Sequence, residues 1–259
     1  MATATNPEDV GYETARIKGV DVLGQVSVML RQRGCRIESI GGLPVEGDFA
    51  APLAEVPSER LQNDAEAWVQ RMLARPGARI STSSPWQPVL VAAVPDSPPA
   101  GTAAHTHLLR GSSRPGELTW VFLLSIDQVR VKHLRSVHDS YAALPADRLP
   151  RRVLVISREK IHPTAAVALR GKDKDLPLIP ERFLLSELSH NVTRHFLVPR
   201  HRLCAPDEVA RLKKQFPKLA LQSREDMISR YHGMVAGDVI VYHRQRLGSF
   251  GGEYFREVA

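Results

Sequence analysis

The chain has 259 residues, of which 43% are hydrophobic and 24% are charged, and its formal net charge is +7. This length suits one large domain or two modest ones, and the composition excludes wholesale disorder. The two cysteines, Cys35 and Cys204, lie in no paired motif, which excludes a disulfide framework and a cysteine-based zinc site.

No segment of the sequence resembles a membrane span or a secretory signal. The longest apolar runs, at 89–94 and 120–124, are far too short to cross a bilayer. The first ten residues are polar and carry two acidic side chains. We therefore expect a soluble intracellular protein that does not bind membranes.

Positive charge is concentrated in the middle of the chain. Residues 101–180 hold 13 basic and 7 acidic side chains, whereas residues 1–100 hold 9 basic and 12 acidic ones. With a sequence pI near 9.7, this distribution is compatible with a polyanionic partner such as nucleic acid. The alternative is an ordinary basic surface with no specific partner.

The first predicted elements are two amphipathic helices. Residues 13–33 carry an apolar stripe at helical spacing, and Gly34 follows where a helix usually ends. A second stripe at helical spacing runs from Leu61 to Leu73 and predicts another helix. Seven prolines then lie between residues 76 and 115.

Short apolar segments and turn residues predict the elements after the second helix. We expect a buried strand at 89–94, an exposed loop or disordered insertion at 95–116, and strands at 120–126 and 152–156. A short helix is predicted at 161–169, opened by Pro163, because proline suits the first helical position.

The alternation of helices and strands predicts an α/β or α+β fold. The charged, proline-flanked segment 171–180 suits a linker. The predicted domains are therefore 1–180, with a Pro/Ser-rich insertion at about 76–118, and 181–259.

Familiar catalytic motifs are absent from the sequence, which holds no Walker-type loop, no G-x-G-x-x-G, no H-E-x-x-H and no G-x-S-x-G. The spacing of His190, His195 and His201 does not repeat on one helix face and favours packing or capping over metal binding. No Asp or Glu is followed two positions later by Lys, the pair that many nucleases use to hold a metal and stabilise the attacked phosphate. We therefore predict no catalytic residue, no cofactor and no metal, with a free-standing DNA-processing protein of nuclease-like fold as the alternative.

Residues 191–201 read Asn-Val-Thr-Arg-His-Phe-Leu-Val-Pro-Arg-His. This segment resembles, in register, the opening of the assembly domain in the fifth subunit shared by eukaryotic nuclear RNA polymerases I, II and III, a domain that also has an archaeal counterpart. The similarity continues through the last third of the chain. The resemblance implies an assembly motif made of Asn191, Thr193, His195, Val198, Pro199, His201, Asp226, Arg230, Tyr231, Gly233 and Gly237.

The N-terminal part is also similar to the eukaryotic form of this family. Residues 29–34 resemble its first helix exit, residues 129–132 its mid-domain strand, and residues 161–165 its Leu-Thr-Pro-like turn. Departures from the family pattern include Ala205, where the family has a capping Ser, and residues 252–254, which match only with a shift. We therefore expect a divergent form, from a eukaryote or a large DNA virus.

The resemblance implies a non-catalytic polymerase subunit, because the phosphodiester chemistry belongs to the two largest subunits. It implies a nuclease-like N-terminal jaw domain near downstream duplex DNA and a small mixed α/β assembly domain that binds the largest subunit. The implied location is the nucleus, with the nucleolus or a viral particle for specialised forms. Within the basic region, Arg130, Lys132 and Arg135 are the candidates for sequence-independent contacts to DNA. For each motif residue, the alternative is a role in the fold without any contact to a partner.

Overall fold

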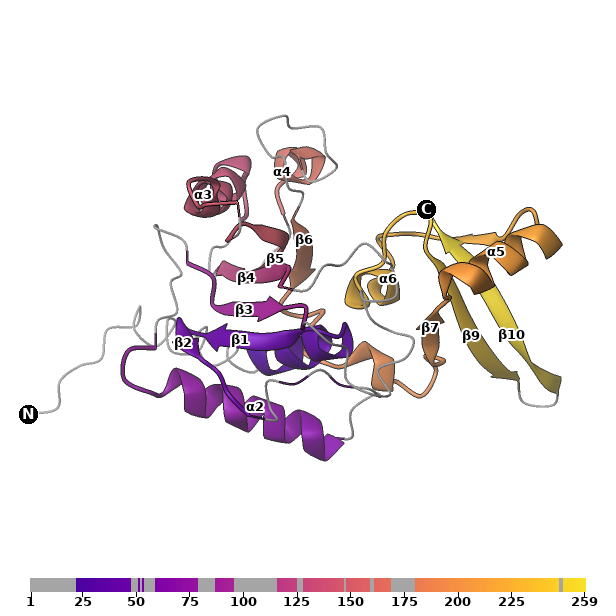
Figure 1. The fold of residues 1–259 in the computed structure, drawn as a ribbon, viewed down its shortest axis with the longest axis horizontal. Helices are drawn as coiled ribbons and strands as arrows, with labels where there is room; N and C mark the ends of the chain where they lie inside the picture. Colours follow the sequence, from indigo (N-terminus) through magenta and orange to yellow (C-terminus); the bar gives the residue numbers. More distant parts are fainter. Residues whose placement is uncertain are drawn as a thin grey trace, which may run out of the picture.

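The computed structural model describes residues 22–47, 51, 53, 59–78, 87–95, 116–124, 128–146, 148–158, 161–168, 180–246 and 249–259. A helix at 22–32 comes first. The labelled elements, drawn in Figure 1, are β1 (Arg36–Ile40), β2 (Leu43–Pro44), α2 (Glu59–Leu73), β3 (Leu90–Ala93), β4 (Leu118–Leu124), α3 (Val131–Ala142), β5 (Pro150–Ser157), α4 (Pro163–Val167), β6 (Glu181–Leu184), η4 (Val192–Arg194), β7 (His201–Leu203), α5 (Pro206–Gln215), β8 (Ala220–Gln222), α6 (Met227–Tyr231), β9 (Val239–Arg246) and β10 (Ser249–Val258).

The first sheet has six strands in the order β2-β1-β3-β4-β5-β6. Its first half is antiparallel, whereas β4, β5 and β6 run parallel to one another. Parallel strands are usually buried on both faces and read as nearly continuous apolar runs, as β4 and β5 do in the sequence.

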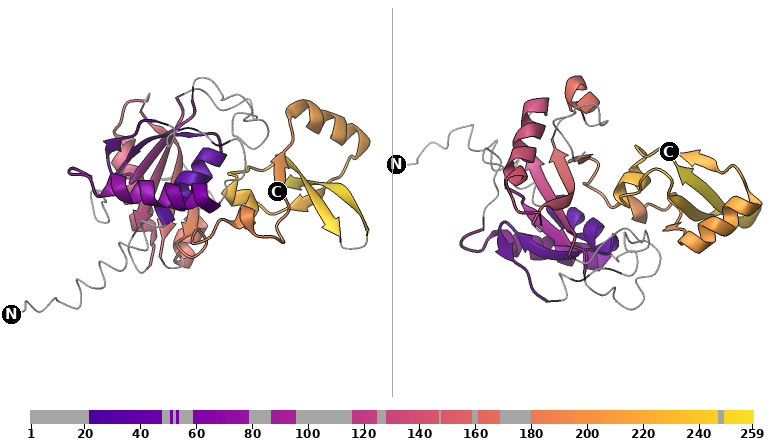
Figure 2. Two further views of the ribbon diagram at one scale, coloured as in Figure 1. Left: turned by 90° about the horizontal axis from the view of Figure 1, so that it is seen from below. Right: turned by 45° about the horizontal axis from the view of Figure 1, so that its top comes forward.

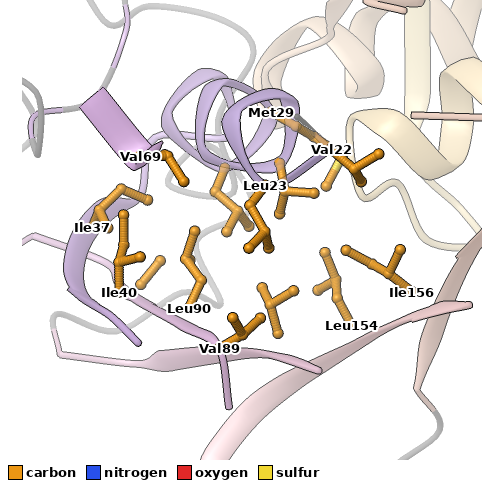
Figure 3. Packing of buried hydrophobic residues seen from close by; sticks show 14 of the residues in the cluster. Val22, Leu23, Met29, Ile37, Ile40, Val69, Val89, Leu90, Leu154 and Ile156 are labelled. Carbon is orange, nitrogen blue, oxygen red and sulfur yellow. The ribbon is translucent and has the colours of Figure 1, made fainter. Parts of the chain in front are cut away.

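Helices cover both faces of this sheet because side chains alternate along each strand. On β4, Val121 and Leu123 join the cluster under the 22–32 helix and α2, which Figure 3 shows in close view. Phe122 and Leu124, which alternate with them, join the cluster under α3 and α4. The first part of the chain is thus a three-layer α/β/α arrangement.

The second sheet has four strands in the order β7-β9-β10-β8. β9 and β10 form an antiparallel hairpin, β7 is antiparallel to β9, and β8 is parallel to β10. α5 packs on one face through Leu212, which lies in one cluster with Val239 and Val241 of β9. Figure 2 shows this smaller sheet and α5 beside the first sheet, with α6 at the junction.

The predicted α/β class is confirmed, and several predicted elements are present. The second helix corresponds to α2, and the strands at 89–94, 120–126 and 152–156 correspond to β3, β4 and β5. Pro163 opens α4 at its first helical turn. Both cysteines are buried and free.

The predicted strand at 129–132 is wrong, because Val131 and Lys132 begin α3. Leu134, Val137 and Tyr141 of that helix are buried, and their spacing of three and four residues places them on one helical face. This apolar stripe packs the helix against the first sheet, which the four residues that resemble the family's strand did not reveal.

Other predictions fall wholly or partly outside the described residues. These are residues 13–21 of the first helix, 96–115 of the expected loop and 171–179 of the expected linker. The domain boundary after residue 180 stays a prediction, and the first sheet extends beyond it through β6.

Glu181, the first residue of β6, lies between the guanidinium groups of Arg33 and Arg152. Arg33, at the end of the 22–32 helix, is fully buried and its Nη2 lies 2.8 Å from Glu181 Oε2. Arg152 of β5 donates from Nη1 to Glu181 Oε1 at 2.9 Å. One carboxylate therefore neutralises parts of two buried or half-buried guanidinium groups.

The same two arginines hold the C-terminal end of α6. Arg33 donates from Nε to the Tyr231 carbonyl oxygen at 2.9 Å and from Nη2 to the Arg230 carbonyl oxygen. Arg152 donates to the Gly233 carbonyl oxygen at 3.2 Å. The last carbonyl groups of a helix lack their usual partner within the helix. The bonds from Arg33 and Arg152 supply donors there, in addition to the bond from the Gly233 nitrogen to the Arg230 oxygen at 2.9 Å, and fix α6 to the first sheet.

Tyr231 adds a hydrophobic contact to this junction. Its side chain is buried within the core cluster of the first sheet, and its hydroxyl donates to Gln32 Oε1 at 2.6 Å. α6 comes between β8 and β9 in the chain, so the junction also positions the second sheet.

We predict that Arg33→Ala destabilises the protein strongly. The substitution leaves Glu181 with one guanidinium partner and removes the Arg33 bonds to the Tyr231 and Arg230 carbonyl groups, which is expected to lower the free energy of unfolding by about 3–5 kcal/mol. Urea denaturation measures the loss. Arg36→Ala is the matched control, because Arg36 is about half exposed and only 3.9 Å from Glu38, and it should change stability by at most about 0.5 kcal/mol. Equal losses in both variants would contradict the role assigned to Arg33.

We also predict a stability loss in acid that depends on Glu181. Burial alone would raise the pKa of Glu181, but Arg33 and Arg152 outweigh burial and hold the pKa below its usual 4.5. The stabilisation is therefore complete above pH 4.5 and is lost as the pH falls through the pKa of the folded state. Urea midpoints measured from neutral to strongly acidic pH should fall less steeply for Glu181→Gln than for the wild type. Parallel curves would overturn this assignment.

Candidate partner-binding surface

The predicted assembly motif begins with a local cap. Asn191 Oδ1 accepts hydrogen bonds from the backbone nitrogen of Thr193 at 3.0 Å and from its hydroxyl at 2.6 Å. Asn191 is buried and stands at the N-terminus of η4. These two motif residues therefore support the fold at the point where the chain leaves the first sheet.

Arg230 and Asp226 organise α6. Arg230 forms two bonds to Glu187, at 2.9 and 2.6 Å, and its guanidinium lies 5.2 Å from the centre of the Phe183 ring. Burial would raise the pKa of Glu187, but its bonds to Arg230 and to the backbone of Leu184 hold it below the usual value. Asp226 caps α6 by accepting a bond from the nitrogen of Ile228 at 2.8 Å.

The two motif glycines stand where the backbone requires positive φ. Gly233 has φ 62° and Gly237 has φ 90°, a region that favours glycine. Gly237 donates from its backbone nitrogen to the Val258 carbonyl oxygen at 2.8 Å. Of the motif residues on and beside α6, Tyr231 and Gly233 are buried and Arg230 is half-buried, whereas Asp226 and Gly237 are exposed.

The centre of the motif is different, because residues 195–198 form an exposed apolar turn. The side chains of Phe196 and Leu197 are 87% and 71% exposed. The turn is held by His195, whose carbonyl oxygen accepts from the nitrogen of Val198 at 2.8 Å and whose Nδ1 accepts from the nitrogen of Leu197 at 3.3 Å. Two adjacent exposed apolar side chains on an ordered turn are typical of a protein interface.

The end of the motif continues onto the second sheet. Val198 and Pro199 are half-buried, and His201 lies on β7 with its ring 5.1 Å from that of Tyr242. Burial lowers the pKa of His201, and the bond to the Pro199 backbone opposes this effect in part. The predicted packing role therefore suits His201, while His195 is an exposed turn residue.

The candidate DNA-facing residues lie at the start of α3. Arg130 is its N-cap, and Lys132 and Arg135 lie within its first two turns. All three side chains are exposed, and no acidic residue lies in the first turn. Burial and the charges of Lys132 and Arg130 lower the pKa of His133, which indicates a positive local potential. The structure therefore places these three cations at the N-cap and in the first two turns of a helix, in place of the predicted strand.

Sequence reasoning missed two features of this surface. Arg152 belongs to the basic region of residues 101–180, but its guanidinium group pairs with Glu181 at the junction with α6. Phe196 was not among the predicted motif residues, although it is the most exposed large apolar side chain among the described residues. Its position between two matching residues of the motif was the available signal.

The described residues include neither a membrane-spanning helix nor a metal-ligand cluster. None of the described helices has both the length and the hydropathy needed to cross a membrane, and no group of three or more metal-ligating side chains occurs in the described ranges. No known protein-family profile matches the chain.

One curated relative is similar over a large part of its length. The Dictyostelium discoideum protein named DNA-directed RNA polymerases I, II, and III subunit rpabc1 is 28% identical over 130 residues, which are 49% of this chain and 64% of that protein. The match thus spans less than two thirds of the relative. The predicted resemblance is confirmed: the chain resembles, in a divergent form, the subunit shared by these three polymerases.

Proposed function

We propose that this chain is a non-catalytic subunit of a nuclear DNA-directed RNA polymerase. The similarity to the shared polymerase subunit is the observation that carries this proposal. The second sheet and the motif around it would form the assembly domain, which anchors the chain to the largest subunit. The first sheet would be the jaw domain, with α3 facing the downstream duplex.

The apolar turn at 195–198 is the part of the motif best suited to anchoring. Phe196 and Leu197 are exposed in this chain, and burying an apolar side chain of this size at an interface is worth about 1.5–3 kcal/mol. Interface energy is usually concentrated in a few such residues. The other motif residues hold this turn and the second sheet in place.

We predict that a tagged wild-type chain co-purifies with the largest polymerase subunit at equal stoichiometry. The variant Phe196→Ala/Leu197→Ala should lose about tenfold or more of this association, because it removes the exposed apolar side chains that would anchor the turn. Its thermal stability should be nearly unchanged, since neither side chain is buried.

The control is Leu149→Ala/Val167→Ala, which removes two exposed apolar side chains elsewhere, 40% and 47% exposed. This control should co-purify like the wild type. Absence of polymerase from the wild-type preparation would refute the proposed function. Full association of the Phe196/Leu197 variant would refute only the anchoring role of the turn.

The cations of α3 would contact DNA through phosphates. Arg130, Lys132 and Arg135 are exposed at the start of a helix that has no acidic residue in its first turn. Phosphate contacts of this kind release counterions and depend on salt but not on base sequence.

We predict that reversing the charge at these three positions weakens DNA retention by the intact polymerase. The variant Arg130→Glu/Lys132→Glu/Arg135→Glu should lower the slope of log affinity against log salt by up to about three units, roughly one for each phosphate that is no longer neutralised. Salt-dependent retention on unrelated duplexes measures the slope. The matched control reverses Arg211, Lys214 and Lys218, which are exposed cations on or just after α5, and should keep the wild-type slope. An unchanged slope in a variant that keeps all its subunits would exclude α3 from DNA contact.

A further inference from the structure

The face of the second sheet opposite α5 carries a cluster of aromatic and cationic side chains. Strand register places His201 beside Tyr242, Tyr242 beside Tyr254, and Arg244 beside Gly252. Directly paired residues of neighbouring strands point to the same side of a sheet. We call His201, Tyr242, Arg244, Tyr254 and Arg256 the arginine–tyrosine face.

The rings and guanidinium groups of this face are stacked in an ordered way. The Tyr242 and Tyr254 rings are 5.7 Å apart and inclined by only 17°. Arg244 lies 5.6 Å from the centre of the Tyr242 ring and 6.0 Å from that of Tyr254, and Arg256 lies 5.8 Å from Tyr242. Two cations thus converge on one ring, each in the geometry of a cation–π contact.

These two arginines have no carboxylate partner among the residues that the structure describes. The two acids of β10 point to the other face of the sheet: Glu257 is 2.8 Å from Lys213 of α5, and Glu253 is 3.2 Å from His243. Burial is the main cause of the lowered pKa of His201, the Pro199 backbone and Asp226 oppose it, and the charges of Arg244 and Arg256 add to the lowering. Asp226 thus opposes the effect of these charges on His201, but no described carboxylate forms an ion pair with Arg244 or Arg256.

Arg244 itself is exposed among the described residues. Its cross-strand neighbour is Gly252, which has no side chain to cover the guanidinium. Tyr254 is 39% exposed, and α5, with its hydrophobic cluster, lies on the opposite face. A guanidinium laid on a ring keeps the outer edges of its fork free for a planar anion.

We propose that the arginine–tyrosine face binds an acidic, extended segment of a partner polypeptide. Carboxylates of the segment bind Arg244 and Arg256, and an intervening side chain packs on Tyr254. The inference deepens the proposed function, on which it rests for the partner's class, since that partner would be another subunit of the polymerase.

The aromatic geometry favours a peptide over single-stranded nucleic acid. Nucleic-acid platforms stack successive bases on separate, open ring faces. Tyr242 is only 4% exposed, because Tyr254, His201 and the arginines surround it. One exposed tyrosine offers no run of stacking sites, whereas two free guanidinium groups suit a pair of carboxylates.

The test measures peptide binding to the isolated whole chain by fluorescence anisotropy. The probes are a short labelled peptide of repeated Glu-Val pairs, its Gln-Val counterpart and a labelled oligo-dT. Wild-type chain should bind the Glu-Val peptide about tenfold or more tightly than the Gln-Val peptide, because the latter cannot form charge-assisted bonds. Arg244→Ala/Arg256→Ala should reduce Glu-Val binding to the Gln-Val level.

The control variant Arg211→Ala/Lys214→Ala removes the same charge from α5, where both side chains are exposed, and should bind like the wild type. The proposal would be overturned if the Arg244/Arg256 variant bound the Glu-Val peptide as tightly as the wild type does. It would also be overturned if the wild type bound oligo-dT more tightly than the Glu-Val peptide and the variant lost that oligo-dT binding. The assay uses no polymerase, so its result is distinguishable from a failure of the wild-type chain to co-purify with that enzyme.

Discussion

A half-buried carboxylate and two arginines link the first sheet to α6. Glu181 pairs with Arg33 and Arg152, and the same arginines donate to the carbonyl groups that end α6. Buried charges are costly unless they are paired and hydrogen-bonded, so the three side chains are mutually dependent. Because α6 leads into β9, the position of the second sheet depends on this cluster.

The motif residues at the junction differ in role from the exposed turn within the motif segment. Tyr231, Arg230 and Gly233 are held at the junction by hydrogen bonds and packing, and a substitution there would act first on stability. Phe196 and Leu197 face solvent on a turn, where a substitution leaves the core intact. A surface that binds a partner can therefore be separated experimentally from the residues that position it.

Charge is segregated between the two faces of the second sheet. Glu253 and Glu257 lie on the face covered by α5, and Glu257 meets Lys213 there. Arg244 and Arg256 lie on the opposite face, supported by tyrosine rings. The alternation of side chains along β10 produces this separation, which places opposite charges on opposite sides of one thin layer.

The sequence alone determined the α/β class, the positions of α2, β3, β4 and β5, and the resemblance to a shared polymerase subunit, because these depend on local apolar periodicity and on adjacent residues. It did not predict α3 at Val131–Ala142, because the family resemblance placed a strand at 129–132. Nor did it predict that Arg33 is buried, since a basic residue at a helix end usually faces water. Only the tertiary structure decided that role: Glu181 is 148 residues away in the chain, and a pairing over that separation leaves no local pattern.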